Sequence, residues 1–121
     1  MEDATFTALV AGGSIAAAGV LVGMVGRRGR QGRLPRQQWA GIRTPSTMRS
    51  DETWLAAHRA GGGAIELAGW VAAVLGGAAA LLRAPDQRWT IALTLIAGAV
   101  FVLGVTYGGI RGVRAARRCT N

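Results

Sequence analysis

Three long apolar segments constrain this chain more than any other feature of its sequence. They cover residues 5–26, 60–82 and 90–110, and the only charged side chain within them is that of Glu66. As a helix, the first segment would rise about 33 Å, which is enough to cross a hydrocarbon core of about 30 Å. We therefore predict an all-α, polytopic membrane protein with three transmembrane helices, forming a single membrane domain over residues 1–121.

The charged residues lie between and after these segments, and their distribution predicts an orientation. All 14 basic residues are arginine, and the net charge is +8. Residues 27–60 hold eight arginines against two acids, residues 83–89 hold two against one, and the basic tail 111–121 holds four. Because cytoplasmic segments of membrane proteins are enriched in arginine, we predict that the N-terminus lies outside the cell. The C-terminus and the loop and helix of residues 27–59 are then cytoplasmic.

The arginines also bear on the partners of the chain. Each basic residue near a membrane surface is attracted to anionic headgroups by about 1 kcal/mol, so we expect anionic lipid at the arginine-rich loop and at the tail. Strong basicity is also typical of nucleic-acid-binding proteins. This chain has no such motif, however, and its arginines lie where a membrane protein places them. We expect no nucleic-acid partner.

The stretch 35–62, between the first two apolar segments, combines arginines, tryptophans, acids and the only histidine. Ser50 is a favourable N-cap residue, and the two acids that follow it suit the first turn of a helix. No proline occurs from there to residue 82. We predict an interfacial helix that begins at Ser50 and continues into the membrane, loosened at glycines 61–63.

Small residues recur at helical spacing on the first and third segments. Such faces let two helices approach through their backbones. This pattern leaves open whether the partner helix belongs to the same chain or to a second copy in a homo-oligomer. The residues are Gly12, Ala16, Gly19, Gly23 and Gly26 on the first segment, and Gly104, Gly108 and Gly112 on the third.

Glu66 is the most informative single residue, because a carboxylate in a membrane-spanning segment is costly and often functional. Arg59 precedes it by seven residues near the same helix face, and Arg43 on the loop is a second candidate partner. Three interpretations remain open. Glu66 forms a structural ion pair that pins the loop to the helix, responds to a proton or ligand, or extends to the interface.

Trp54 and His58 are four residues apart and share a face of the predicted helix. We interpret Trp54 as an interfacial anchor and His58 as a hydrogen-bonded structural residue, with a role in pH sensing or metal binding as the alternative. Trp70, within the second apolar segment, is expected to pack or to face lipid.

The sequence offers little support for catalysis. It contains no nucleophile triad, no carboxylate pair with acid–base spacing, no phosphate-binding loop and no zinc-site spacing, and Cys119 is the only cysteine. We expect a protein that is not an enzyme and that requires no cofactor or metal.

The stretch GIRTPSTMRSDETWLAAHRAGG, preceded by RLPRQQWA, resembles the motif of the SdpI family of bacterial membrane proteins. Gln37 stands where that family usually has asparagine ahead of its Gly-Ile-Arg. The resemblance covers about a quarter of the chain, and the apolar segments that follow also fit it. The matching residues are Gly41, Ile42, Arg43, Thr44, Thr47, Ser50, Asp51 or Glu52, Trp54, His58 and Arg59.

The resemblance implies a small multi-pass protein of the bacterial plasma membrane. The family is named for an immunity protein that protects a cell from its own secreted peptide toxin and holds a transcriptional repressor at the membrane. It therefore implies immunity to, or sensing of, a membrane-active peptide, with or without a repressor partner. The polar cluster expected to respond consists of Arg43, Thr44, Trp54, His58, Arg59 and Glu66.

Two alternatives come from different classes of protein. One is a small oligomeric transporter in which Glu66 is the coupling carboxylate. The other is a hydrophobic scaffold or accessory subunit of a larger membrane complex.

Overall fold

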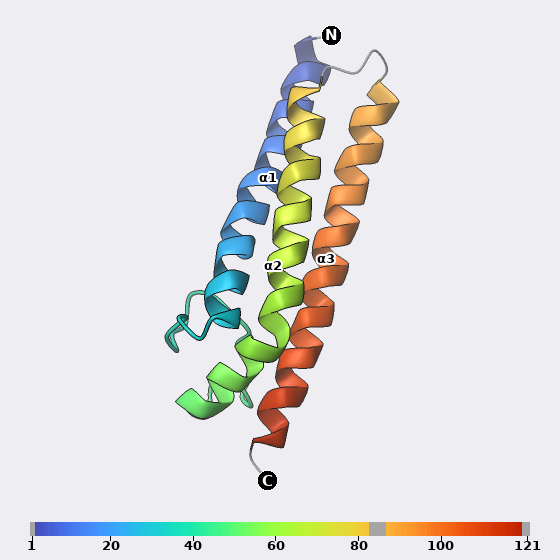
Figure 1. Cartoon of the computed structure of the whole chain (residues 1–121). Coiled ribbons are helices and arrows are strands. Elements are labelled where there is room, and N and C mark those ends of the chain that lie inside the picture. Colours follow the sequence, from blue (N-terminus) through green and yellow to red (C-terminus); the bar gives the residue numbers. More distant parts are fainter. Residues whose placement is uncertain (1, 83–86, 120–121) are drawn as a thin grey trace.

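Three long helices make up almost the whole structure (Figure 1). The computed structural model describes residues 2–82 and 87–119, and they form α1 (Glu2–Arg30), α2 (Asp51–Leu81) and α3 (Gln87–Arg118). All three helices are long and apolar enough to cross a membrane, and the described residues contain no strand. The prediction of an all-α fold with three membrane-spanning helices is confirmed. The turn expected between the second and third helices falls largely on residues 83–86, outside the described part.

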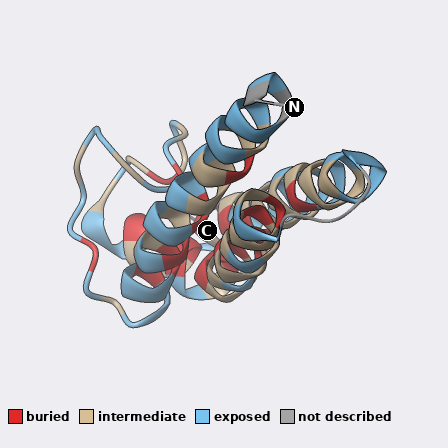
Figure 2. Ribbon diagram, turned by 90° about the horizontal axis from the view of Figure 1, so that it is seen from above, coloured by how far each residue is buried: buried red, intermediate tan, exposed pale blue. Residues whose placement is uncertain are grey.

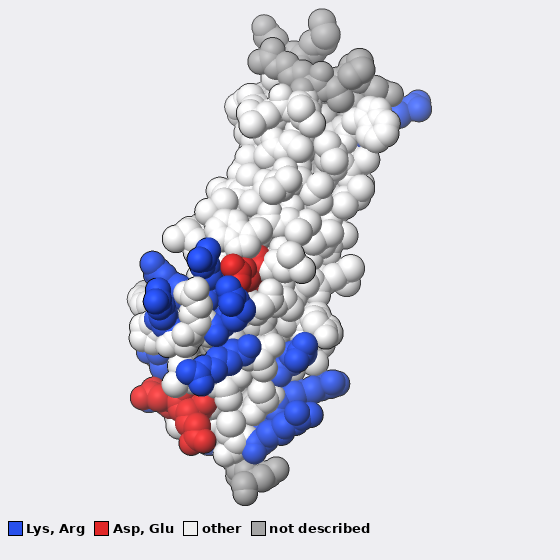
Figure 3. Space-filling model, viewed as in Figure 1, with Lys and Arg blue, Asp and Glu red and all other residues white. Residues whose placement is uncertain are grey.

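Each helix is longer than its apolar segment. α1 continues through the arginines at 27, 28 and 30, and α3 continues through the basic tail to Arg118. Arginine is a good helix former, and cations are favourable near a helix C-terminus. With 31 residues, α2 rises about 46 Å, so its ends extend beyond a hydrocarbon core of about 30 Å. Basic side chains gather at the end of the bundle that carries the loop (Figure 3).

α2 begins where the sequence predicts. Ser50 is the N-cap, its side chain accepts a hydrogen bond from the backbone N–H of Thr53 at 3.1 Å, and the Thr53 hydroxyl accepts from the backbone N–H of Ser50 at 3.0 Å. This reciprocal capping box satisfies two backbone donors at the helix start. The helix is not interrupted at glycines 61–63, although it bends near its N-terminal end (Figure 1).

Ser50→Ala is expected to lower the free energy of unfolding by about 1 kcal/mol, because the N-cap acceptor is lost. Thermal unfolding in a mild detergent measures this difference. Ser46→Ala is the matched control, since the Ser46 side chain makes no hydrogen bond within the described residues. Equal melting temperatures for the two variants would contradict the role of the capping box.

α2 is the central helix, and α1 and α3 pack on it while barely touching one another. In the view along the bundle, buried residues lie where the helices face each other and exposed residues cover the outside (Figure 2). The exposed outer faces carry large apolar side chains such as Leu21, Val74 and Leu95. This is the arrangement of a bundle whose outer surface is solvated by lipid.

The small-residue stripe of α1 packs on α2 of the same chain. A Cβ added to Gly19 would lie 2.5 Å from the carbonyl oxygen of Gly69, and one added to Gly12 would lie 2.6 Å from that of Gly76. Backbone is therefore in contact with backbone, which only glycine permits. On α3, a Cβ at Gly108 would meet the carbonyl oxygen of Gly61 at 2.7 Å. Both glycine faces thus serve packing within the chain.

Candidate functional site

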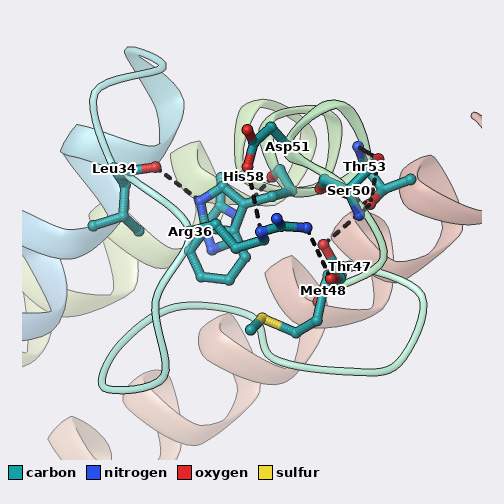
Figure 4. Close-up of polar contacts among 9 residues, drawn as sticks. Leu34, Arg36, Thr47, Met48, Ser50, Asp51, Thr53 and His58 are labelled. Atoms are coloured by element: carbon teal, nitrogen blue, oxygen red, sulfur yellow. Dashed lines mark hydrogen bonds and ion pairs between the residues drawn. The ribbon is translucent and has the colours of Figure 1, made fainter.

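The loop between α1 and α2 folds back over the first turns of α2, and Trp54 lies at the centre of this contact. Its side chain is 1% exposed, and its indole Nε1–H donates to the carbonyl of Leu34 at 2.8 Å (Figure 4). The interpretation of Trp54 as an interfacial anchor is therefore wrong. The ring is a core residue that joins the loop to α2.

His58 is held by backbone groups on both sides of its ring. Nε2 accepts a hydrogen bond from the N–H of Ile42 at 2.9 Å, and Nδ1 lies 2.8 Å from the carbonyl oxygen of Trp54. An N–H donor on one side and a carbonyl acceptor on the other select the neutral imidazole with its proton on Nδ1. The ring centroid also lies 4.1 Å from that of Trp54. His58 is a hydrogen-bonded structural residue, as the sequence indicates, and both nitrogens are occupied.

Gly41 and Ile42 extend the loop as far as α3. Gly41 has φ of +105°, and a Cβ there would lie 2.5 Å from Nε2 of His58, so this position requires glycine for two reasons. The side chain of Ile42 is 8% exposed. Its Cδ1 lies 3.1 Å from where a Cβ of Gly61 would be and 2.5 Å from where a Cβ of Gly112 would be. Two glycines, one on α2 and one on α3, thus form the notch that Ile42 fills.

Threonine hydroxyls fix the second half of the loop. Thr47 is fully buried, and its hydroxyl donates to the carbonyl of Ile42 at 2.7 Å, while Thr44 N–H donates to the Thr47 hydroxyl at 2.9 Å. The Thr53 hydroxyl lies 3.1 Å from the carbonyl of Thr47 and links this turn to α2. Thr44, a predicted site residue, therefore contributes to the shape of the loop.

Two exposed arginines stabilise the outside of the loop by polar contacts. Arg36 lies 3.3 Å from a carboxylate oxygen of Asp51 and donates to the carbonyl of Met48 at 3.1 Å (Figure 4). Arg43 donates to the carbonyl of Gln38. Beside Arg36, a hollow of about 490 Å³ opens between the start of the loop and the first turns of α2. It is lined by Gly32, Arg33, Leu34, Pro35, Arg36, Asp51, Trp54 and Leu55.

Glu66 is paired with a residue of α1. One carboxylate oxygen lies 2.8 Å from Nε of Arg30, and the other accepts from the indole N–H of Trp70 at 3.2 Å. The prediction of Arg59 or Arg43 as partner is wrong. The Arg59 guanidinium instead lies against Gly32, 3.1 Å from where a Cβ would be. Arg30 reaches Glu66 because α1 remains helical past the end of its apolar segment.

The predicted polar cluster divides into two groups. Trp54, His58 and the loop form one, and Glu66 with Arg30 and Trp70 forms the other, about two turns or 12 Å further along α2. The last turn of α1 touches both groups. A Cβ on Gly29 would lie 3.0 Å from the Cβ of His58, and the next residue is Arg30. Arg30 was not predicted as the partner of Glu66, although the basic residues at the end of α1 indicated a candidate.

The family model described as the SdpI/YfhL protein family matches residues 33–108, from the loop through α2 and most of α3. The matched region contains Glu66 and Trp70, whereas Arg30 lies just before it. No curated protein and no solved structure matches the chain. The match covers more than half of the sequence, so the chain belongs to the SdpI/YfhL protein family.

Proposed function

We propose that this membrane protein confers immunity to, or senses, a membrane-active peptide toxin. The ion pair of Glu66 and Arg30 carries the proposal. A carboxylate in a membrane-spanning helix is expensive, and here it is both paired and accessible. The side chain of Arg30 is 48% exposed and that of Glu66 is 16% exposed. Membership of the SdpI/YfhL protein family supports the proposal, because the resemblance to that family implies an immunity role.

The chemistry of the pair suits an amphipathic peptide in the interfacial layer. A cationic or amide group of the peptide can replace Arg30 as the partner of Glu66. A carboxylate of the peptide can then form an ion pair with the released Arg30 guanidinium. Trp70 donates to Glu66 from one turn further along α2 and keeps the carboxylate oriented. This exchange of partners would shift the last turn of α1, which lies against both Glu66 and His58. The shift would carry the effect of peptide binding to His58 and the loop.

The charge distribution supports an orientation in which this end of the bundle is cytoplasmic. The loop arginines and those at the end of α3 lie at the same end (Figure 3), and positive charge favours the cytoplasmic side. The N-terminus would be outside and the C-terminus inside. A toxin bound in the membrane and a cytoplasmic repressor would then meet the protein near the same loop.

The transporter alternative finds less support in the packing. Backbone contact between α1 and α2 at Gly12, Gly19 and Gly26 leaves no aqueous path along this seam. A path would require several copies of the chain. Flux of a substrate into vesicles that depends on Glu66 would favour this alternative, and co-purification of a stable membrane complex would favour a scaffold.

Glu66→Gln and Arg30→Gln are each expected to reduce protection at least about tenfold, the equivalent of about 1.4 kcal/mol of lost interaction. The measurement is survival of bacteria that express each variant and are challenged with a secreted peptide toxin of the kind that SdpI-type immunity proteins counter. Glu52→Gln is the matched control, because Glu52 is an exposed acid on the same helix.

The double variant Arg30→Glu with Glu66→Arg distinguishes a structural role of the ion pair from a role in recognising the peptide. If the pair only holds α1 to α2, the exchange restores protection. If the cluster recognises the peptide, protection remains lost although the protein is present in the membrane at the wild-type level. Full protection by Glu66→Gln at normal expression would contradict the proposal.

A further inference from the structure

Trp39 is the most exposed large apolar side chain in the described residues. It is 90% exposed. The other exposed large apolar residues lie on the three helices or at the end of α2, where lipid can cover them. Trp39 lies on the loop outside the helices. A single exposed apolar side chain is common on a soluble surface, so the surroundings of Trp39 decide whether it has a partner.

The loop holds this indole outward by a built turn. The side-chain carbonyl of Gln37 accepts from the N–H of Trp39 at 2.7 Å and from the N–H of Ala40 at 2.8 Å, and its amide donates to the carbonyl of Ala40 at 3.0 Å. The Arg43 guanidinium closes the turn by donating to the carbonyl of Gln38. One side chain thus satisfies three backbone groups around Trp39. The turn is ordered although the indole itself is exposed.

The turn lies near the level at which α1 ends, where the arginines that follow Gly26 predict the membrane interface. Ile42 fills the notch between Gly61 and Gly112, and a Cβ on the neighbouring Gly62 would lie 2.7 Å from the backbone nitrogen of Arg30. Ile42 is therefore level with the last turn of α1, about 6 Å beyond the end of its uncharged segment at Gly26. Trp39 precedes Ile42 by three residues, so the two Cα atoms are at most about 11 Å apart. The loop also lies beside the end of α1 in Figure 1.

The charge of the loop around Trp39 is mainly positive, although Arg36 also lies 3.3 Å from a carboxylate oxygen of Asp51 at the start of α2. Residues 31–50 contain four arginines and no acid. All four, Arg33, Arg36, Arg43 and Arg49, are exposed. Tryptophan is enriched at the headgroup level of membranes, and basic residues there attract anionic lipid.

We propose that residues 36–43 dock on the headgroup layer of the same membrane, with Trp39 inserted among anionic phospholipids and the neighbouring arginines on their phosphates. The depth of the turn and its charge favour lipid over a protein partner. The docked turn would hold the loop against the surface of the bilayer, beside the helix bundle. This inference needs only membrane insertion of the helices and is independent of what the protein recognises.

The test is tryptophan fluorescence of the full chain in vesicles of phosphatidylcholine with and without phosphatidylglycerol. Subtracting the signal of Trp39→Phe from that of the wild type isolates the emission of Trp39, and the substitution leaves the fold intact because the side chain is exposed. We expect this component to be quenched by brominated lipid and shielded from acrylamide. Adding phosphatidylglycerol should shift it further to the blue.

Two variants provide the controls. Gln37→Ala removes the three hydrogen bonds of the turn and is expected to make Trp39 more accessible to acrylamide. Subtracting the signal of Trp89→Phe isolates the emission of Trp89, an exposed tryptophan at the start of α3 that follows Arg88 and lies away from the four loop arginines. Its component should shift less than that of Trp39 when phosphatidylglycerol is added. A Trp39 component that acrylamide quenches freely in both vesicles would overturn the proposal and point to a protein as the occupant.

Discussion

Trp54→Ala is expected to lower the free energy of unfolding by about 3–5 kcal/mol, the range for truncating a large buried aromatic residue. Trp54 is 1% exposed, and its indole donates to the carbonyl of Leu34 at 2.8 Å. The substitution opens a cavity under the loop, leaves that carbonyl without its partner and removes the ring on which His58 packs. Thermal or denaturant unfolding in a mild detergent measures the loss.

Trp39→Ala is the matched control, since it removes the same side chain from the same part of the chain. Trp39 is 90% exposed, so its loss in detergent should change the free energy of unfolding by no more than about 0.5 kcal/mol. Similar losses for the two variants would show that Trp54 does not form the core between the loop and α2.

Gly69→Ala is expected to destabilise the packing of α1 on α2 by about 1–3 kcal/mol, the usual effect of forcing one extra carbon into a tight interface. A Cβ at this position would lie 2.6 Å from the carbonyl oxygen of Gly19. The neighbouring atom is backbone and cannot rotate away, so the two helices must separate. Unfolding in detergent and crosslinking between cysteines placed on α1 and α2 both report this separation.

Gly77→Ala distinguishes tight packing from a general effect of replacing glycine. Gly77 is on the same helix, but a Cβ there would meet no atom within 4 Å. Alanine also has the higher helix propensity, so this variant should be as stable as the wild type or more stable. Destabilisation of both variants to the same extent would exclude close contact at Gly69 as the cause.

The fold could be predicted from the sequence because its main determinant is local. Three apolar segments of bilayer length, with Glu66 as their only charged residue, define three helices, and Ser50 with its acidic neighbours marks the start of α2. The small residues of α1 predicted a packed face, but their spacing could not identify the partner. That choice depends on how α1, α2 and α3 are arranged, which the pattern of a single helix does not contain.

The site was harder to predict because its contacts join distant residues. Glu66 bonds to Arg30, which is 36 positions away, and Trp54 bonds to Leu34 across 20. Arg59 was a reasonable partner for Glu66 by helical spacing, but the choice depended on where α1 ends. The role of Gln37 was also hidden, since its bonds are to the backbone of Trp39 and Ala40.

The position of Ile42 links the loop to the spacing of two membrane helices. Its side chain occupies the notch formed by Gly61 on α2 and Gly112 on α3, while α1 itself barely contacts α3. Withdrawing the loop would empty that notch and leave the end of α3 with less to pack against. By thermodynamic reciprocity, a molecule that bound better to the withdrawn loop would loosen α3, and one that tightened α3 on α2 would retain the loop. The position of the loop at the membrane surface and the packing of α3 on α2 within the bilayer would then change together, as parts of one equilibrium.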